Sequence, residues 1–301
     1  MKQNRPKVGL VLSGGGAKGV AHLGVLKVLE KENIPIDMIV GTSIGALIGG
    51  IYASEMNIEE MEKIALNMNW KQLLRLTDLT KPTTALVNGQ KIENFINSLV
   101  NNKTFDDTRI PFAAIAVDAI SGKEAILTRG HVTDAIRASI STPVVFSPVK
   151  RGNKLLIDGG VINPLPADVA RKMGADVVIA VNLLTEASTK NRFSHLPETS
   201  NRKIVTKEVT KKGFPEIVYS RMITSVKKRF RPPTVFQLAM RAVDLMQREL
   251  SEAKLKYASL VIAPQVEDVS YYDFSKAKEI ITLGERAAEK AIPDIKKILE
   301  G

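Results

Sequence analysis

Cysteine is absent from the chain, and histidine occurs only three times, at His22, His131 and His195. Without cysteine, the chain forms neither disulfide bonds nor thiolate metal sites, and a thiolate nucleophile is excluded. With only three histidines, we do not expect a histidine-rich metal site either.

Long hydrophobic runs are also absent. No stretch approaches the roughly 18 apolar residues that a membrane-spanning helix needs. Residues 1–7 are charged and polar, and the apolar run after them reaches glycine within about five residues, which is too short for a secretory signal. We therefore expect a cytoplasmic protein, with peripheral membrane contact as the alternative that the charge distribution raises.

Acidic residues are scarce in one segment. The formal net charge is +11, and residues 189–233 carry 12 Lys or Arg against three Glu, a net charge of +9. No nucleic-acid-reading motif accompanies this charge, so nucleic acid is not an expected partner. The segment also contains apolar residues at helical spacing, namely Phe214, Ile217, Val218, Met222, Val226 and Phe230. Such a helix either lies on an anionic membrane or packs on the domain with its charges solvated.

Up to about residue 183, short apolar runs alternate with helical patterns. This alternation predicts an α/β fold with a mostly parallel sheet. An expected hairpin between 112–117 and 124–127 makes the sheet mixed. The expected strands are 8–12, 38–41, 112–117, 124–127, 154–157 and 176–182. The expected helices are 20–32, 45–53, 58–68, 90–100, 131–139 and 166–173.

The pattern changes after Leu184. A polar stretch at 185–201 predicts a loop, and further expected elements are helices at 203–230, 235–250 and 275–299 and a strand at 260–263. No Pro/Gly/Ser-rich linker separates two cores. We predict one domain over 1–301, with a core at about 7–183 and a basic, helical elaboration at about 184–301.

A glycine-rich turn follows the first expected strand. Gly14, Gly16 and Gly19 fit G-x-G-x-x-G, and a helical pattern begins directly after them. In this context backbone N–H groups and a helix N-terminus face an anion. The anion is either a bound dinucleotide pyrophosphate or an oxyanion that forms during a reaction.

The dinucleotide alternative makes its own prediction, an acidic residue at the end of the second strand. Asp37 precedes the strand at 38–41 instead of ending it, and Val20 stands where a Walker motif needs lysine. These departures favour an oxyanion, and an NAD(P)-binding oxidoreductase remains the alternative.

A second motif, G-x-S-x-G, occupies Gly41, Ser43 and Gly45 between a strand pattern and a helix pattern. This is the setting of a nucleophile elbow, in which small residues allow a tight turn and the serine hydroxyl is lifted out of the sheet. An ordinary turn with a capping serine is the alternative.

A serine nucleophile needs a base. His195 lies in a polar, basic stretch without a strand to position it, and we expect His22 and His131 to be structural or capping residues. Asp158 is the better candidate, because it ends an apolar strand and precedes Gly159 and Gly160. We expect its apolar neighbours to raise its pKa by desolvation; a β-turn aspartate is the alternative. These neighbours are Leu155, Leu156, Ile157, Val161 and Ile162.

Together these motifs resemble the patatin-like phospholipases, particularly their compact bacterial members. The likeness covers about residues 7–183 and recurs weakly at 285–288. It is carried by Gly14 to Gly19, Gly41 to Gly45 and Asp158 to Gly160, and it extends through 137–141 with Pro143, 161–166 and 176–181.

The resemblance implies a three-layer α/β fold and a serine acyl hydrolase of lipid esters that needs no cofactor. Ser43 would be the nucleophile, Asp158 the base, and the amides of Gly14, Gly15 and Gly16 the oxyanion hole. The family often has arginine where this chain has Lys18, which leaves the role of that cation open. A catalytically silent lipid-binding protein is the further alternative.

Overall fold

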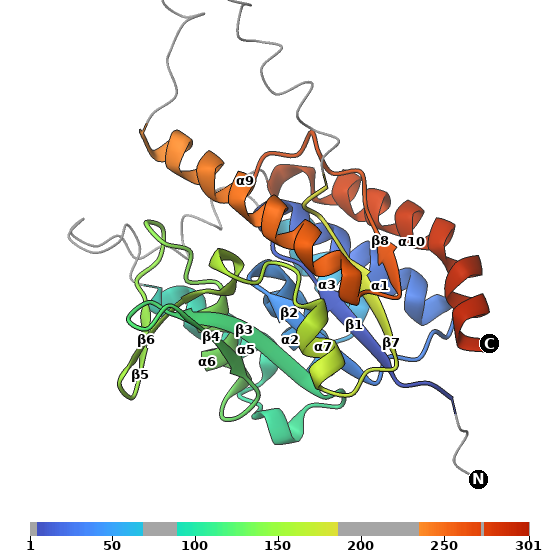
Figure 1. Ribbon diagram of the computed structural model, residues 1–301, viewed down its shortest axis with the longest axis horizontal. Helices are drawn as coiled ribbons and strands as arrows, with labels where there is room; N and C mark the ends of the chain where they lie inside the picture. The colour runs from blue at the N-terminus through green and yellow to red at the C-terminus, as the bar shows by residue number, and fades with distance from the viewer. Residues whose placement is uncertain (1–4, 69–88, 186–234, 272–273, 301) are drawn as a thin grey trace, which may run out of the picture.

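A computed structural model of the protein describes residues 5–68, 89–185, 235–271 and 274–300. An eight-stranded mixed sheet lies at its centre, with helices on both faces (Figure 1). The strands are β1 Val8–Leu12, β2 Met38–Thr42, β3 Phe112–Asp118, β4 Lys123–Leu127, β5 Val149–Arg151, β6 Lys154–Asp158, β7 Val177–Val181 and β8 Leu260–Ile262. All were expected except β5, whose three residues are too few to show a period.

The helices agree with the expected ones to within a few residues in the described part of the chain. Expected structure at 186–234 lies outside the described residues. The main helices are α1 Ala21–Lys31, α2 Ile44–Ala53, α3 Ile58–Asn67, α5 Gln90–Val100, α6 Val132–Ser139, α7 Ala167–Lys172, α9 Val235–Lys254 and α10 Ala277–Glu300. Short 3-10 helices include η1 Gly16–Val20, η3 Gly159–Val161, η5 Leu255–Tyr257 and η6 Phe274–Lys276.

The strand order is β5-β6-β3-β2-β1-β7-β8, and β4 pairs with β3 outside this path. The strands from β3 through β2, β1 and β7 to β8 pair in parallel, whereas β4 and β6 pair antiparallel with β3. The mostly parallel, mixed sheet and the β3–β4 hairpin are thus confirmed.

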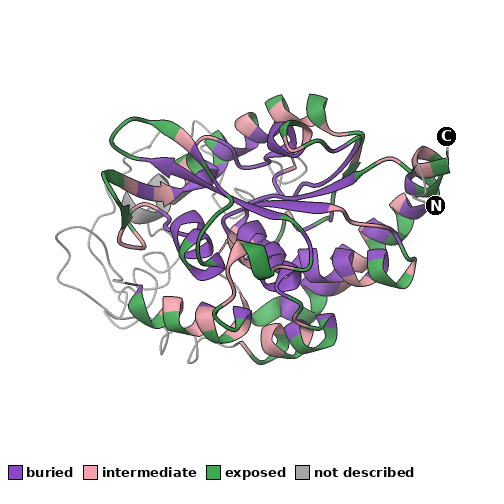
Figure 2. Cartoon of the chain, turned by 90° about the horizontal axis from the view of Figure 1, so that it is seen from below, coloured by how far each residue is buried: buried purple, intermediate pink, exposed green. Residues whose placement is uncertain are grey.

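Alternate residues of the central strands point into two separate apolar cores. Leu10 and Leu12 of β1 pack in the larger core with α1, α2, α5, α6 and α10, and Val11 packs in the smaller core with α7. Figure 2 shows the buried sheet between these helices. The fold is therefore the expected three-layer α/β arrangement.

The C-terminal region contributes to the sheet and to the larger core. β8 pairs in parallel with β7, from Leu260 opposite Ile179 to Ile262 opposite Val181. Ile281 and Ala288 of α10 are buried in the core that α1 also lines. The hydrophobic core therefore continues past residue 183, because β8 and α10 complete surfaces that β7 and α1 would otherwise expose.

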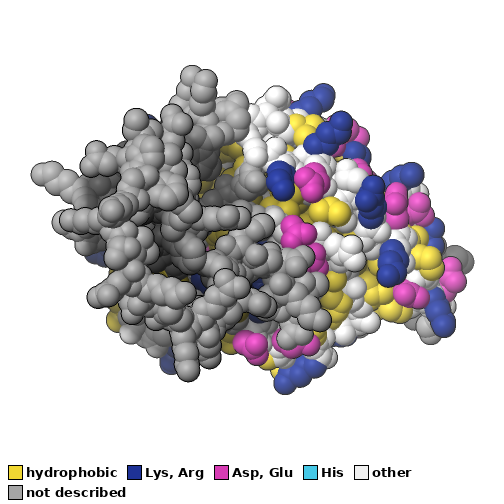
Figure 3. Space-filling model, turned by 90° about the horizontal axis from the view of Figure 1, so that it is seen from above, with side chains coloured by type: hydrophobic (Ala, Val, Ile, Leu, Met, Phe, Trp, Pro, Cys, Tyr) yellow, Lys and Arg dark blue, Asp and Glu magenta, His cyan; other side chains and the backbone are white. Residues whose placement is uncertain are grey.

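The described surface carries both signs of charge. Figure 3 shows Lys and Arg interspersed with Asp and Glu on the face seen from above. The basic segment 189–233 lies outside the described residues. Among the helices of the described residues, none is long and apolar enough to cross a membrane.

Candidate active site

The strands β2 and β6 end next to each other on one edge of β3. β2 is parallel to β3, and its last residue, Thr42, pairs with Ile115. β6 is antiparallel, and its last residue, Asp158, pairs with Ala116. Because β4 pairs with overlapping residues of β3, it takes the opposite edge. Ser43 therefore lies beside Asp158, although 115 positions separate them in sequence.

Ser43 occupies a strained turn between β2 and α2. Its backbone has φ 55° and ψ −123°, outside the regions that side-chain-bearing residues usually adopt. A Cβ at Gly45 would overlap the carbonyl oxygen of Leu12, so α2 starts this close to β1 only with glycine there. The turn is held by Ser139, whose Oγ accepts from the Ser43 amide at 2.9 Å and donates to the Ile115 carbonyl at 2.6 Å. A tight, strained turn between a strand and a helix is the backbone geometry that a nucleophile elbow requires.

The Ser43 hydroxyl donates a hydrogen bond to Asp158, with 2.7 Å between Oγ and Oδ2. Thr142 Oγ1 donates to the same carboxylate oxygen at 2.8 Å, and the Gly160 amide donates to Oδ1 at 2.8 Å. The Asp158 side chain is thus fixed by three donors while being only 1% exposed.

Burial raises the pKa of the Asp158 carboxyl, although the donors from Gly160, Ser43 and Thr142 act in the opposite direction. The predicted direction is therefore confirmed. The apolar neighbours that were expected to desolvate Asp158 do so only in part, because Leu156 is buried whereas Val161 is 39% exposed. Asp158 also pairs with Ala116 of β3, and its amide donates to the Ser141 carbonyl, so these segments enclose it as well.

The glycine-rich loop lies against the elbow, since a Cβ on Gly14 would come within 3.6 Å of the Ser43 Cβ. The expectation of three free amides needs a correction: the Gly14 amide donates to the Pro164 carbonyl at 3.0 Å. In the described part of the chain, the amides of Gly15 and Gly16 have no such acceptor. The loop therefore leaves two amides without an acceptor directly after Gly14, the glycine that lies against Ser43.

The hydrogen bonds of the glycine-rich loop also argue against a bound dinucleotide pyrophosphate there. Besides the Gly14 amide, the Ala17 amide is taken by a protein carbonyl, that of Tyr271, at 2.8 Å. Asp37 binds Arg5 and the Val8 amide, so its carboxylate already has partners at the other end of β1.

The remaining motif residues, Lys18 and the glycines at 19, 41, 159 and 160, lie in closely packed surroundings. Lys18 is 2% exposed within η1, so its side chain lies in the interior. Further glycines let segments approach closely. A Cβ would overlap the Ile44 side chain at Gly19, the Ile115 carbonyl at Gly159, the Gln247 amide at Gly160 and the α2 backbone at Gly41.

Two of the three histidines lie in the described residues. His22 is fully buried, and its Nε2 donates to the Ser13 carbonyl at 2.9 Å, because a carbonyl only accepts. Burial lowers the pKa of His22 to about 4. A buried, neutral imidazole that donates to a backbone carbonyl is what a structural histidine would show. His131 stands at the N-cap of α6 without a side-chain capping bond, and His195 lies outside the described residues.

Three groups to which the sequence motifs assign no role hold the candidate dyad in place: Ser139, Thr142 and the Gly160 amide. The first two belong to the mainly polar run Ser139-Ile140-Ser141-Thr142, which begins at the last residue of α6. A polar run that directly follows an apolar helix pattern was the available signal.

The chain is similar to one protein family and to several characterised and uncharacterised proteins. Residues 10–171 match the family described as patatin-like phospholipase. The chain is 36% identical over 187 residues to Neuropathy target esterase sws of Drosophila melanogaster, which covers 60% of this chain and 13% of that protein. It is 30% identical over 295 residues to an NTE family protein of Mycobacterium tuberculosis, covering 96% of this chain and 47% of that protein.

Among solved structures, VipD from Legionella pneumophila has a similar fold. The TM-score is 0.50 at 13% sequence identity, over 98% of this chain and 67% of that chain. The chain spans about half, or less, of the length of the curated relatives first matched. The match to residues 10–171 nevertheless covers more than half of the chain. The chain belongs to the patatin-like phospholipase family.

Proposed function

We propose that the protein is a serine hydrolase of lipid esters that uses Ser43 as nucleophile and Asp158 as general base. The observation that carries the proposal is the 2.7 Å hydrogen bond from Ser43 Oγ to Asp158 Oδ2, where β2 and β6 end. Nucleophile and base within hydrogen-bond reach are the signature of covalent catalysis.

In the first half-reaction, Asp158 takes the hydroxyl proton as Ser43 Oγ bonds to the ester carbonyl carbon. The tetrahedral intermediate collapses with cleavage of the C–O ester bond, and the leaving alcohol takes the proton from Asp158. In the second half, Asp158 takes a proton from water as the water oxygen attacks the acyl-Ser43 carbon, and the proton returns to Ser43 as the acid leaves.

The negative charge on the intermediate requires donors. The amides of Gly15 and Gly16 are the candidates, because they follow Gly14, which lies against Ser43, and have no acceptor among the described residues. One such donor is worth about 3 kcal/mol of barrier lowering in a serine hydrolase.

An apolar pocket suits the acyl part of a lipid substrate. It opens between α2, α3 and α5, and all of its lining side chains in the described chain are apolar. Ile44, the residue after Ser43, lines it together with Leu47, Ile48, Met61, Phe95 and Leu99. The names of the relatives, an esterase and phospholipases, are in line with a lipid ester as substrate.

A fluorophosphonate probe tests the nucleophile. We expect covalent labelling of Ser43 in the purified chain, identified by peptide mapping, and no labelling of Ser43→Ala. An active protein in which Ser43 stays unlabelled would contradict the proposal.

Ester turnover of two further variants tests the base. Asp158→Asn should abolish hydrolysis across a lipid panel, whereas His195→Ala should retain nearly all of it. The reverse pattern would restore a histidine-containing triad. Binding to vesicles without any hydrolysis would instead favour a silent lipid-binding protein.

Peripheral membrane contact through residues 189–233 belongs to the same proposal and rests on their net charge of +9. Cosedimentation should then be stronger with anionic than with neutral vesicles and should weaken in high salt. Equal binding to both vesicles would favour a segment that packs on the domain.

A further inference from the structure

The helix α9 presents one buried face to the loops around the candidate dyad. Asp244, Gln247, Arg248 and Ser251 are buried, whereas Leu245 and Met246 between them are exposed. This spacing places the buried side chains on one side of the helix. The side chains at 247, 251 and 254 each meet a different loop of the site.

Gln247 and Ser251 contact the loops that carry the base and the glycines. The Gln247 amide packs on Gly160, whose own amide holds the Asp158 carboxylate. Ser251 Oγ donates to Asn182 Oδ1 at 3.0 Å, directly after β7. The next residue, Leu183, donates its amide to Ser13 Oγ at 3.0 Å, immediately before the glycine-rich loop.

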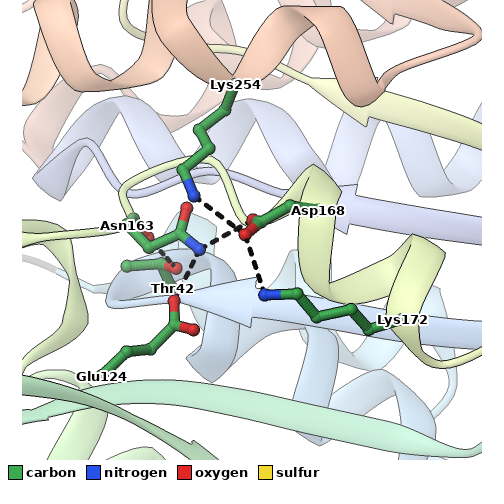
Figure 4. A network of polar contacts seen from close by, with 6 residues as sticks. All are labelled: Thr42, Glu124, Asn163, Asp168, Lys172 and Lys254. Carbon is green, nitrogen blue, oxygen red and sulfur yellow. Dashed lines mark hydrogen bonds and ion pairs between the residues drawn. The ribbon is translucent and has the colours of Figure 1, made fainter.

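Lys254 starts a partly buried polar network that reaches the elbow (Figure 4). Its Nζ lies 2.9 Å from Asp168 Oδ2, and Asp168 Oδ1 accepts from Asn163 Nδ2 at 2.9 Å. The Asn163 carbonyl in turn accepts from Thr42 Oγ1 at 2.8 Å. Thr42 precedes Ser43, so the network runs from α9 to the nucleophile turn in four residues.

Asn163 joins the two loops of the dyad. It ends the short loop that begins at Asp158, and its backbone amide donates to the Gly159 carbonyl. Its side-chain Nδ2 donates to Glu124 at 2.6 Å as well as to Asp168. The orientation is therefore fixed, because a flipped amide would set its oxygen against two carboxylates.

Lys254 balances part of the negative charge that Asp168 and Glu124 place around Asn163. Burial alone would raise the pKa of Asp168, but the hydrogen bonds from Lys254 and Asn163 outweigh it and keep that pKa low. Lys172 also reaches Asp168, at 3.3 Å, with its side chain 63% exposed. The less exposed Lys254 is consequently the stronger of the two cationic partners.

We infer that Asn163 and Lys254 are positioning residues, which hold the Asp158 loop at a set distance from the Ser43 elbow with α9 as their support. This inference rests on the proposed function. Small displacements of reacting groups lower turnover strongly, so loss of the network should act on kcat.

The kinetic test compares Lys254→Met with Lys256→Met, a matched change of an exposed lysine close to it in the chain. We expect Lys254→Met to lower kcat roughly tenfold or more with little change in KM, and Lys254→Arg to recover most of it. Lys256→Met should behave as the wild type. Equal kcat values for Lys254→Met and Lys256→Met would overturn the inference.

Hydrogen exchange tests the same inference without activity. Lys254→Met, and Asn163→Asp with its added carboxylate, should speed exchange of the amides at 159–163 relative to Lys256→Met. If Lys254→Met does not fold, Lys254→Gln takes its place. An inactive wild type that still shows this exchange difference would refute the proposed function alone. Unchanged exchange in an active enzyme would refute the inference alone.

Discussion

Asp158 has to meet two opposing requirements in the proposed mechanism, because a base must be ionised before it takes a proton and must also hold that proton well. Its burial raises the pKa above the ordinary value of 3.8. An ionised Asp158 is therefore less favourable in the folded than in the unfolded chain. Its stability contribution is fully present below pH 3.8 and is lost as the pH rises through the raised folded pKa.

Replacing this carboxyl should therefore stabilise the protein while abolishing turnover. We expect Asp158→Asn to raise the free energy of unfolding at pH 7 by roughly 1 kcal/mol. The hydroxyls of Ser43 and Thr142 can rotate to accept from the new amide. Urea denaturation at pH 7 and pH 4 measures the difference, which should shrink at pH 4. A variant that is less stable at pH 7 would mean that the three hydrogen bonds to the carboxylate outweigh its desolvation.

His22 predicts the opposite pH dependence. Its pKa is about 4 in the folded chain, against 6.5 ordinarily, so the unfolded chain binds a proton that the folded chain does not. Stability is present above pH 6.5 and falls as the pH drops toward 4. Between pH 7 and pH 5, the wild type should lose about 2 kcal/mol more than His22→Gln. Parallel urea titrations check this, and equal losses would show that His22 is charged when folded.

At the scale of elements, α1 and α10 pack with their backbones in close contact. A Cβ on Gly24 of α1 would overlap the Ile281 carbonyl, and a Cβ on Gly284 of α10 would overlap the Ala21 carbonyl. Both obstacles are backbone atoms, which cannot rotate away. The two glycines thus allow the helices to touch along their backbones.

Gly284→Ala should therefore destabilise the fold, although alanine favours helices by about 1 kcal/mol. Overpacking of this kind costs about 1–3 kcal/mol and should outweigh the gain in helix propensity. The melting temperature measures the net effect. Glu289→Ala, at an exposed position of α10, is the control and should change the stability by less than about 0.5 kcal/mol. A more stable Gly284→Ala would show that α1 and α10 separate easily.

Sequence patterns predicted individual helices and strands better than they predicted contacts between them. β1 is buried along its length, β3 is apolar from Phe112 to Val117, and α1 shows helical spacing, so these local patterns sufficed. β5 was missed, because three residues, two of them exposed and basic, give no period. The closeness of α1 and α10 was not predictable either, since it depends on which glycines face each other.

On the scale of the whole molecule, the region beyond residue 183 completes the fold. β8 covers the edge of β7, and α10 covers α1. A chain that ends at residue 185 should therefore not unfold cooperatively, because it would expose a sheet edge and one face of its core. Near-ultraviolet circular dichroism and thermal melting against the full chain check this. A cooperative transition of the shortened chain would restore the core boundary predicted near 183.

The amino-acid sequence by itself determined the succession of strands and helices along the described regions, apart from β5, together with the α/β class and the candidate residues Ser43 and Asp158. Each of these depends on a local signal: a period, a glycine spacing, or a carboxylate at the end of an apolar run. Local signals are set by neighbours along the chain and can be read without knowing what lies across the sheet.

Only the tertiary structure decided which groups meet. β2 and β6 approach the same edge of β3 from opposite directions, and this brings Ser43 within 2.7 Å of Asp158. The same arrangement directs the Gly14 amide to Pro164 and brings Lys254 to Asp168. The central strands are buried at every residue, so their apolar runs have no alternation that would specify register or edge, and contacts between distant segments decide both.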